Sequence, residues 1–224
     1  MPSVTHAPVT VVIPMYQTAA YIAEALDSIH AQTLRPERVI VVDDGSTDLG
    51  PAIVAARNDV ELLRRPHLGI GPTIDAGLAL VRSEYVAILD ADDRWLPGKT
   101  AIQLACLRDQ LELGMVFGHA RRFVMTPAGE QHLDVMPGIY TSGGLFRRSM
   151  LDLLGPWMHP EGSHCFFNWY NRTKESGVKE LLLPDIICER RIHDSNHGIL
   201  NRAEQRRAYF TTIKAALDRR RAAP

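Results

Sequence analysis

Apolar and polar positions along the first half of the chain predict strands and helices in turn. Short runs rich in valine and isoleucine occupy residues 9–13, 38–42, 60–63 and 85–89. Because these runs are almost continuously apolar, each predicted strand is expected to be buried on both faces, as in a parallel sheet covered by helices. The pattern therefore predicts an α/β fold with a mostly parallel central sheet.

A crossover helix is predicted between the first two strands. Within residues 21–31 the apolar positions fall on one helical face, and they are Ile22, Ala25, Leu26 and Ile29. Thr18 lies shortly before this stretch and is a candidate cap for the start of the helix. The order strand, helix, strand is that of a β-α-β unit.

The second half of the chain is less regular. The predicted elements are a helix over 97–112, a strand over 115–126 that ends in a turn, a helix over 165–176, short strands over 181–183 and 186–188, and a final helix over about 201–221. The chain shows no internal repeat and no clear linker, so we expect a single domain over residues 1–224.

Charge and composition exclude some classes of function. The chain has 224 residues, 46% of them hydrophobic and 23% charged, which are ordinary values for a globular protein. A formal net charge of −1 gives no broad cationic field, so binding of nucleic acid through its phosphates is not expected.

Cysteine usage and the N-terminus bear on location. The three cysteines are an odd number without CxxC spacing, which argues against a disulfide framework and a zinc ribbon and fits a reducing cytoplasm. Residues 1–8 lack a signal-peptide pattern, and no apolar stretch approaches the roughly 20 residues that span a bilayer. A cytoplasmic location is the expectation.

Polar residues follow three of the predicted strands, at residues 14–17, 43–48 and 90–93. Ligands of open parallel sheets bind beyond the carboxyl ends of the strands, so we expect these segments to meet at one edge. A carboxylate of the second segment is able to accept hydrogen bonds from a base or ribose, and Gly45 lets the backbone turn closely around a ligand. Taken alone, such a segment is more often an ordinary turn with a helix cap.

The spacing of Asp90 and Asp92 indicates a shared ligand, because alternate residues leaving a strand point to the same side. A hard divalent cation such as Mg²⁺ or Mn²⁺ prefers carboxylate and phosphate oxygens, and it neutralises charge on a departing diphosphate. The alternative is an acidic loop that caps the helix beginning near Pro97.

The chain resembles the family 2 glycosyltransferases of GT-A fold from about residue 9 to residue 196. The resemblance rests on three strings, at residues 11–16, 41–48 and 87–93, which match the motifs of that family in order and at its usual spacing. It implies a three-layer α/β/α sandwich, with a Rossmann-like nucleotide-sugar-binding half over about 9–120 and an acceptor half over about 121–200.

The resemblance also implies the donor and metal residues. The residues implied to bind the donor are Pro14, Tyr16 and Asp44 at the base and ribose, Asp90 and Ala91 near the ribose, Gly144 beside the sugar, and Arg191 at the diphosphate. Asp92 and His193 are implied as metal ligands. A β-turn at residues 143–144, a surface salt bridge of Arg191 and a hydrogen-bonded surface histidine are the alternatives.

Two departures from the family pattern concern donor contacts and catalysis. Ile74 and Asp75 stand where relatives carry arginine and asparagine. Ahead of Trp169, relatives carry an acidic pair that supplies the catalytic base, and this chain has none. Glu161 and His164 are the candidate replacements, since either side chain is able to accept a proton, while Glu161 also reads as an ordinary loop carboxylate.

The leading hypothesis is an inverting, metal-assisted transfer of a sugar from a UDP-sugar to an acceptor hydroxyl on a glycan, lipid-linked glycan or peptide. A binding or regulatory protein of the same fold without catalysis is the alternative. Nucleotidyl transfer is a third reading, but no glycine-rich phosphate loop with its signature lysine supports it.

The C-terminal segment over about 201–221 is amphipathic and basic. A helix packed on the domain with a solvated face explains this pattern. The alternative is contact with an acidic partner or with anionic lipid at the inner face of the membrane.

Overall fold

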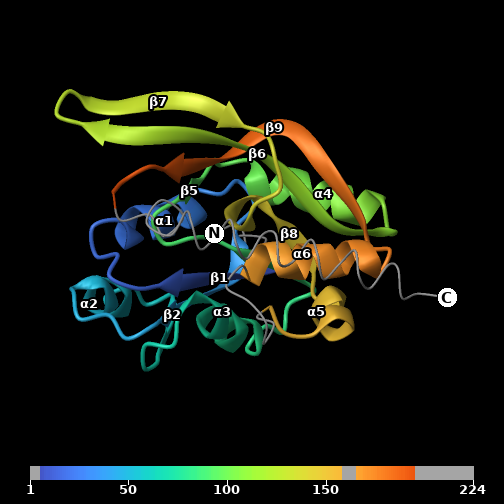
Figure 1. The fold of residues 1–224 in the computed structure, drawn as a ribbon, viewed down its shortest axis with the longest axis horizontal. Helices are drawn as coiled ribbons and strands as arrows, with labels where there is room; N and C mark the ends of the chain where they lie inside the picture. The colour runs from blue at the N-terminus through green and yellow to red at the C-terminus, as the bar shows by residue number, and fades with distance from the viewer. Residues whose placement is uncertain (1–5, 158–164, 195–224) are drawn as a thin grey trace, which may run out of the picture.

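The computed structural model describes residues 6–157 and 165–194 (Figure 1). The strands are β1 Ala7–Met15, β2 Pro36–Asp43, β3 Glu61–Arg64, β4 Tyr85–Ile88, β5 Arg94–Trp95, β6 Leu113–Thr126, β7 Gly129–Met136, β8 Leu145–Arg147 and β9 Lys179–Arg191. The helices are α1 Ile22–His30, α2 Gly50–Ala55, α3 Ile70–Leu78, α4 Lys99–Asp109, the 3₁₀ turn η1 Thr141–Gly143, α5 Ser149–Leu154 and α6 Cys165–Glu175.

The strands form one mixed sheet in the order β3-β2-β1-β4-β8-β6-β9-β5, with β7 paired to the outside of β6. The block β3-β2-β1-β4 is parallel throughout. In the second half, β6 and β9 are parallel, whereas β8 runs antiparallel to both β4 and β6. The α/β class with a mostly parallel sheet is confirmed, and each of the antiparallel pairs includes a strand from the second half of the chain.

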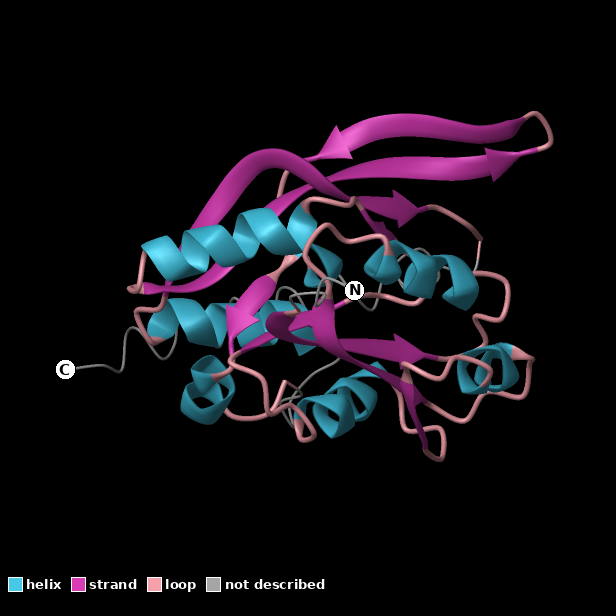
Figure 2. Ribbon diagram, turned by 180° about the vertical axis from the view of Figure 1, so that it is seen from behind, coloured by secondary structure: helices cyan, strands magenta, loops and turns pink. Residues whose placement is uncertain are grey.

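Helices cover both faces of this sheet (Figure 2). Residues of α1 and α4 share one apolar core with alternate strand residues such as Val11 and Ile13. Residues of α3, α5 and α6 share a second core with the intervening strand residues, such as Val12. Because side chains alternate along a strand, a continuous apolar run fills both cores at once, which is why the predicted strands are uniformly apolar.

The start of α1 differs from the prediction in its capping. The four apolar residues of its predicted face are buried as expected. The Thr18 side chain makes no cap hydrogen bond; instead its backbone carbonyl accepts the N–H groups of Tyr21 and Ile22. The helix therefore begins on a backbone turn rather than on a side-chain cap.

The second half contains the largest differences from the predicted elements. The two short strands predicted over 181–183 and 186–188 belong to one long strand, β9, whose register with β6 shifts at several points. Strand β7 was not predicted, because six of its eight residues are exposed and it lacks an apolar face. It forms the outer arm of a hairpin with β6, and Gly129 supplies the left-handed backbone of the turn at φ 111°.

Two further expectations concern membranes. Within the described parts of the chain, no helix is long and apolar enough to cross a bilayer. The basic helix predicted over about 201–221 lies outside the described residues.

Candidate functional site

The carboxyl ends of β1, β2 and β4 bring the predicted polar segments to one edge of the sheet. Met15 at the end of β1 pairs with Asp43 at the end of β2, and the backbone N–H of Asp44 donates to the Met15 carbonyl over 2.8 Å. Pro14 is buried within β1, whereas Tyr16 follows the strand and is 45% exposed. The predicted convergence of these residues therefore holds in the structure.

Asp43 is fully buried and serves the loop itself. Its carboxylate accepts the backbone N–H of Ser46 over 3.0 Å and the Nε–H of Arg64 over 3.1 Å. Both oxygens have partners within the protein, so Asp43 fixes the turn that follows β2.

Asp44 is also buried, and it joins this turn to the segment that precedes α3. One carboxylate oxygen accepts the N–H of Leu68 over 2.8 Å and the other accepts the N–H of Gly69 over 2.9 Å. The second oxygen lies 2.8 Å from Nδ1 of His67. Gly45 allows this approach, because its φ is 81° and a Cβ there would stand 2.9 Å from the His67 nitrogen.

An aromatic pair covers this part of the edge. The rings of Tyr16 and His67 stack with centroids 4.1 Å apart and planes 20° apart. Gln17, at φ 53°, holds the neighbouring turn, because its side-chain carbonyl accepts the N–H groups of Thr47 and Asp48. Figure 1 shows these loops at the ends of β1 and β2.

The carboxylates after β4 lie close together in a poorly hydrated environment. Burial and the neighbouring Asp92 carboxylate raise the pKa of Asp90 to about 6. The pKa of Asp93 is raised well above its ordinary value by burial and by its two acidic neighbours. The Ser142 hydroxyl bridges the group, since it accepts the N–H of Asp90 and donates to Asp93. Like charges held this closely favour a cation or a proton between them.

Asp92 lies beside His193, the second predicted metal ligand. The imidazole Nε2 is 2.9 Å from an Asp92 carboxylate oxygen, and both side chains keep partial contact with solvent. The Tyr21 ring packs on His193 with centroids 4.7 Å apart. A carboxylate and an imidazole on one accessible edge, with the raised pKa of Asp90 beside them, fit a divalent cation.

Arg191 is 5% exposed and its guanidinium is used within the protein. It ion-pairs with Glu24 and donates from Nε to the Asp92 carbonyl over 3.1 Å. The rings of Tyr21 and Phe123 lie 5.1 and 4.5 Å from its centre. These contacts hold the backbone of the Asp92 loop in place.

Arg190 points to the other face of β9, because neighbouring strand residues alternate. Its charge lowers the pKa of both Asp90 and Asp93, against the upward effect of burial. The charge of Arg190 thus acts on these carboxylates, a role that the sequence prediction had not assigned to it.

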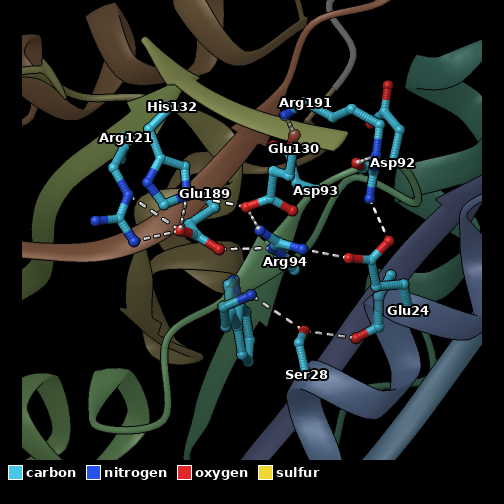
Figure 3. A network of polar contacts seen from close by, with 12 residues as sticks. Glu24, Ser28, Asp92, Asp93, Arg94, Arg121, Glu130, His132, Glu189 and Arg191 are labelled. Atoms are coloured by element: carbon cyan, nitrogen blue, oxygen red, sulfur yellow. Dashed lines mark hydrogen bonds and ion pairs between the residues drawn. The ribbon is translucent and has the colours of Figure 1, made fainter. Parts of the chain in front are cut away.

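An ion-pair network connects this loop to the hairpin (Figure 3). Arg94 binds Glu24, Glu130 and Glu189, and Glu189 also binds Arg121. The potential metal-ligand atoms of Glu130, His132 and Glu189 lie within 4.8 Å of one another. Because two arginines already neutralise these carboxylates, the cluster serves as a structural network rather than a cation site.

Buried side chains of β5 and α4 hold the backbone around the glycine pair at 143–144. Three successive backbone carbonyls accept hydrogen bonds from side chains. The Ser142 carbonyl accepts from Trp95 Nε1 over 2.8 Å, and the Gly143 carbonyl accepts from Gln103 Nε2 over 2.8 Å. The Gly144 carbonyl accepts from Lys99 Nζ over 3.1 Å. A Cβ at Gly143 would meet the Tyr140 ring at 2.5 Å, and one at Gly144 would meet the Phe146 ring at 2.2 Å. Packing within the protein therefore accounts for both glycines.

The remaining predicted positions divide into packing roles and undescribed residues. Ile74 is buried in the second core, and Asp75 accepts the backbone N–H of Trp157 over 2.6 Å. The two departures from the family pattern on α3 thus serve contacts within the protein. Glu161 and His164 lie outside the described residues.

Sequence reasoning gave no role to four residues that shape the site. They are Glu24, His67, Lys99 and Ser142. The available signals were a single charge within a helix or a polar residue close to a glycine, and such signals are too common to single out a site.

Comparison with known proteins gives one family. A sequence model described as glycosyl transferase family 2 matches residues 10–172. An uncharacterized glycosyltransferase of Nostoc sp. (strain PCC 7120) is 35% identical over 96 residues, which cover 41% of this chain and 30% of the relative. The chain thus matches about a third of the length of such a relative.

Solved structures share the fold. The mannosyltransferase PcManGT from Pyrobaculum calidifontis, solved with GDP-Man and Mn²⁺, aligns with a TM-score of 0.73 and 20% identity over 96% of this chain and 67% of its own. Residues 1–349 of TarS from S. aureus, solved with UDP-GlcNAc, align with a TM-score of 0.67 and 20% identity over 84% of this chain and 60% of that one. The fold is therefore that of GT-A glycosyltransferases.

Proposed function

We propose that the chain, which belongs to glycosyl transferase family 2, moves a sugar from a nucleotide-diphosphate sugar to an acceptor hydroxyl. The observation that carries this proposal is the meeting of Tyr16 and Asp44 with Asp90 and Asp92 at one carboxyl edge of the sheet. The nucleotide sugars bound by PcManGT and TarS support a donor of this class. We propose a UDP-sugar as the donor, with inversion at the anomeric carbon.

Donor binding in this proposal uses both ends of the edge. Tyr16, Pro14 and the Asp44 loop would line the base and ribose, with Asp90 and Ala91 near the ribose and Gly144 close to the sugar. The single domain would then divide into a donor half over about 9–120 and an acceptor half over about 121–200.

Asp92 and His193 are proposed to hold Mg²⁺ or Mn²⁺, since they offer an oxygen and a nitrogen ligand 2.9 Å apart. When bound, such a cation neutralises negative charge on the departing diphosphate. The protein's own part is to keep the Asp92 loop in place through Arg191 and Glu24.

The diphosphate contact implied for Arg191 is better assigned to a second arginine, Arg190. The Arg191 guanidinium already serves Glu24 and the Asp92 carbonyl. The charge of Arg190, in contrast, lowers the pKa of Asp90 and of Asp93. We assign to Arg190 the direct contact with phosphate oxygens and to Arg191 the support of the metal loop.

A group must also take the proton of the acceptor hydroxyl during inversion. The first turn of α6 carries no acidic residue. Glu161 and His164 precede this helix, and either side chain is able to act as the base.

A nucleotide-sugar-binding protein without catalysis is a second candidate. The observation in its favour is the same lack of an acidic residue in the first turn of α6. The two candidates differ in turnover rather than in donor binding.

The test is nucleotide release from a panel of UDP-, GDP-, CDP- and ADP-sugars, with Mn²⁺ and with a chelator, using the full chain and an acceptor mixture. Glycosyl transfer predicts cation-dependent release of one nucleotide. Binding of a donor without any release would favour the non-catalytic candidate, and absence of both would refute the two together.

A further inference from the structure

The carboxylate expected to recognise the donor base is occupied within the protein. Asp44 accepts two backbone N–H groups, from Leu68 and Gly69, and its second oxygen also lies 2.8 Å from Nδ1 of His67. The Asp44 side chain is only 5% exposed. Three of the roughly four acceptor positions of this carboxylate are therefore used within the protein.

His67 is the exposed partner of this buried carboxylate. Its side chain is 55% exposed, and its ring stacks on Tyr16, which is itself 45% exposed. The two rings stand beside the carboxyl ends of β1 and β2, where ligands of such sheets bind. His67 therefore presents a polar ring edge at the place where a base is expected.

Contacts with Asp44 settle which ring nitrogen of neutral His67 carries the hydrogen. Nδ1 faces the Asp44 carboxylate and lies 3.1 Å from the Asp44 backbone carbonyl. Both are acceptors, so Nδ1 must donate, and Nε2 of the neutral ring is then an acceptor. Within the described residues Nε2 has no hydrogen-bond partner, and it lies on the ring side away from buried Asp44.

We infer that His67, oriented by Asp44 and stacked on Tyr16, selects donors whose base offers an imide or lactam N–H. Uracil and guanine carry such a donor on the edge that pairs with other bases. Cytosine and adenine carry a ring-nitrogen acceptor in the corresponding place, which would face the Nε2 acceptor and leave both without a hydrogen. The inference rests on the proposed function for its ligand class and extends it to the choice of base.

The experiment measures the affinity of UDP, GDP, CDP and ADP for the full chain by calorimetric titration at pH 8. Wild type is expected to bind UDP and GDP at least about 10-fold more tightly than CDP and ADP. His67→Phe keeps a ring against Tyr16 but removes both nitrogens, so its four affinities should fall within about 3-fold of one another.

His30→Phe is the matched control. His30 also pairs with an aspartate, Asp59, over 2.7 Å, but it ends α1 at the opposite edge of the sheet. This variant should keep the wild-type preference.

Each outcome bears on the inference. Equal binding of the four nucleotides by wild type, or an unchanged preference in His67→Phe, would overturn it, and the wild-type comparison holds even if the variant fails to fold. Nucleotide release without base preference would refute the inference and leave glycosyl transfer standing. Base preference without nucleotide release would leave the inference standing and refute glycosyl transfer. A chain that binds no nucleotide would refute both proposals.

Discussion

The two sides of the site are built in different ways. The base side, formed by Tyr16, Asp43, Asp44 and His67, is closed by hydrogen bonds to backbone N–H groups of neighbouring loops. The acidic side, formed by Asp90, Asp92, Asp93 and His193, gathers carboxylates whose burial and mutual repulsion raise the pKa of Asp90 and Asp93.

This difference shows which side is complete without a ligand. On the base side, the buried carboxylates have their hydrogen bonds already, so the loop is preorganised. On the acidic side, the negative charge of the carboxylates is not fully compensated within the protein, so a bound cation or proton stabilises them. Substitutions on the acidic side should therefore change catalysis and pH dependence most, while those on the base side should change affinity.

The largest effect is expected from Asp92→Asn. Loss of the carboxylate weakens the proposed cation site, and we expect turnover to fall by at least about 10³-fold with the melting temperature little changed. Initial rates over a Mn²⁺ series measure this. Asp152→Asn on α5 is the control, because it removes an exposed ion pair with Arg148, whose backbone N–H donates to the Glu84 carbonyl just before β4, at the opposite edge of the sheet. Wild-type rates in Asp92→Asn would refute the assignment.

The second prediction concerns Lys99, which holds the backbone of the segment that carries Ser142, the residue hydrogen-bonded to Asp90 and Asp93. Its ammonium is 1% exposed and its hydrogen-bond partners are the neutral side chain of Gln103 and the Gly144 carbonyl. Burial lowers the pKa of Lys99 from 10.5 to about 7. Between these values the unfolded chain binds more protons than the folded one, so stability should rise with pH, by up to about 3 kcal/mol between pH 7 and 9.

Chemical denaturation across this pH range measures the rise. In Lys99→Met the rise should be largely absent, because no proton is taken up at this position on unfolding. If the free energy of unfolding of Lys99→Met rises with pH as steeply as that of wild type, then the rise does not come from Lys99.

The third prediction has the opposite sign and concerns Asp90. Its pKa is about 6 in the folded protein against 3.8 for the unfolded chain, so the folded state holds the proton longer. Without a divalent cation, stability should fall as pH rises from about 4 to 6, by up to about 3 kcal/mol and by less where water reaches the partly exposed carboxyl.

Asp90→Asn removes part of this fall, and Asp93 contributes the rest in the same direction. Adding Mn²⁺ at pH 7 should raise the melting temperature of wild type, because the cation offsets the carboxylate repulsion. The same addition at pH 4.5 should do little. A cation effect of equal size at both pH values would contradict the electrostatic explanation.

The contrast between the two sides also explains what the sequence could predict. The strands β1, β2 and β4 and the residues that follow them were predictable, because uniformly apolar runs determine a buried parallel sheet and its carboxyl edge. The position of Asp90 beside Asp92 follows from the same rule.

Contacts between distant segments were not predictable in this way. Arg191 pairs with Glu24, which lies 167 positions away in the sequence. The sequence does not show that Glu24 and a diphosphate would compete for the Arg191 guanidinium. The strand β7 lacks an apolar face, so no periodic signal marks it. His67 draws its orientation from Asp44 in a neighbouring loop, which required the structure.

The smallest effect is expected on the base side, from two adjacent aspartates with different partners. Asp44→Ala frees the N–H groups of Leu68 and Gly69 and removes the acceptor that orients His67. Asp43→Ala instead frees the N–H of Ser46 and the Nε–H of Arg64, and it leaves the contact between Asp44 and His67 in place. We expect Asp44→Ala to weaken UDP binding about 10-fold more than Asp43→Ala, the size of one lost hydrogen bond to a charged group.

Both variants leave backbone N–H groups without their carboxylate acceptor, so both should lower the melting temperature. A difference in UDP affinity between them is then not explained by the loss of stability that they share. Titration with UDP well below both melting temperatures makes the comparison. Equal weakening in the two variants would mean that the aspartates support the base side only through the fold. A larger loss in Asp43→Ala would place the base nearer the Arg64 turn and away from His67.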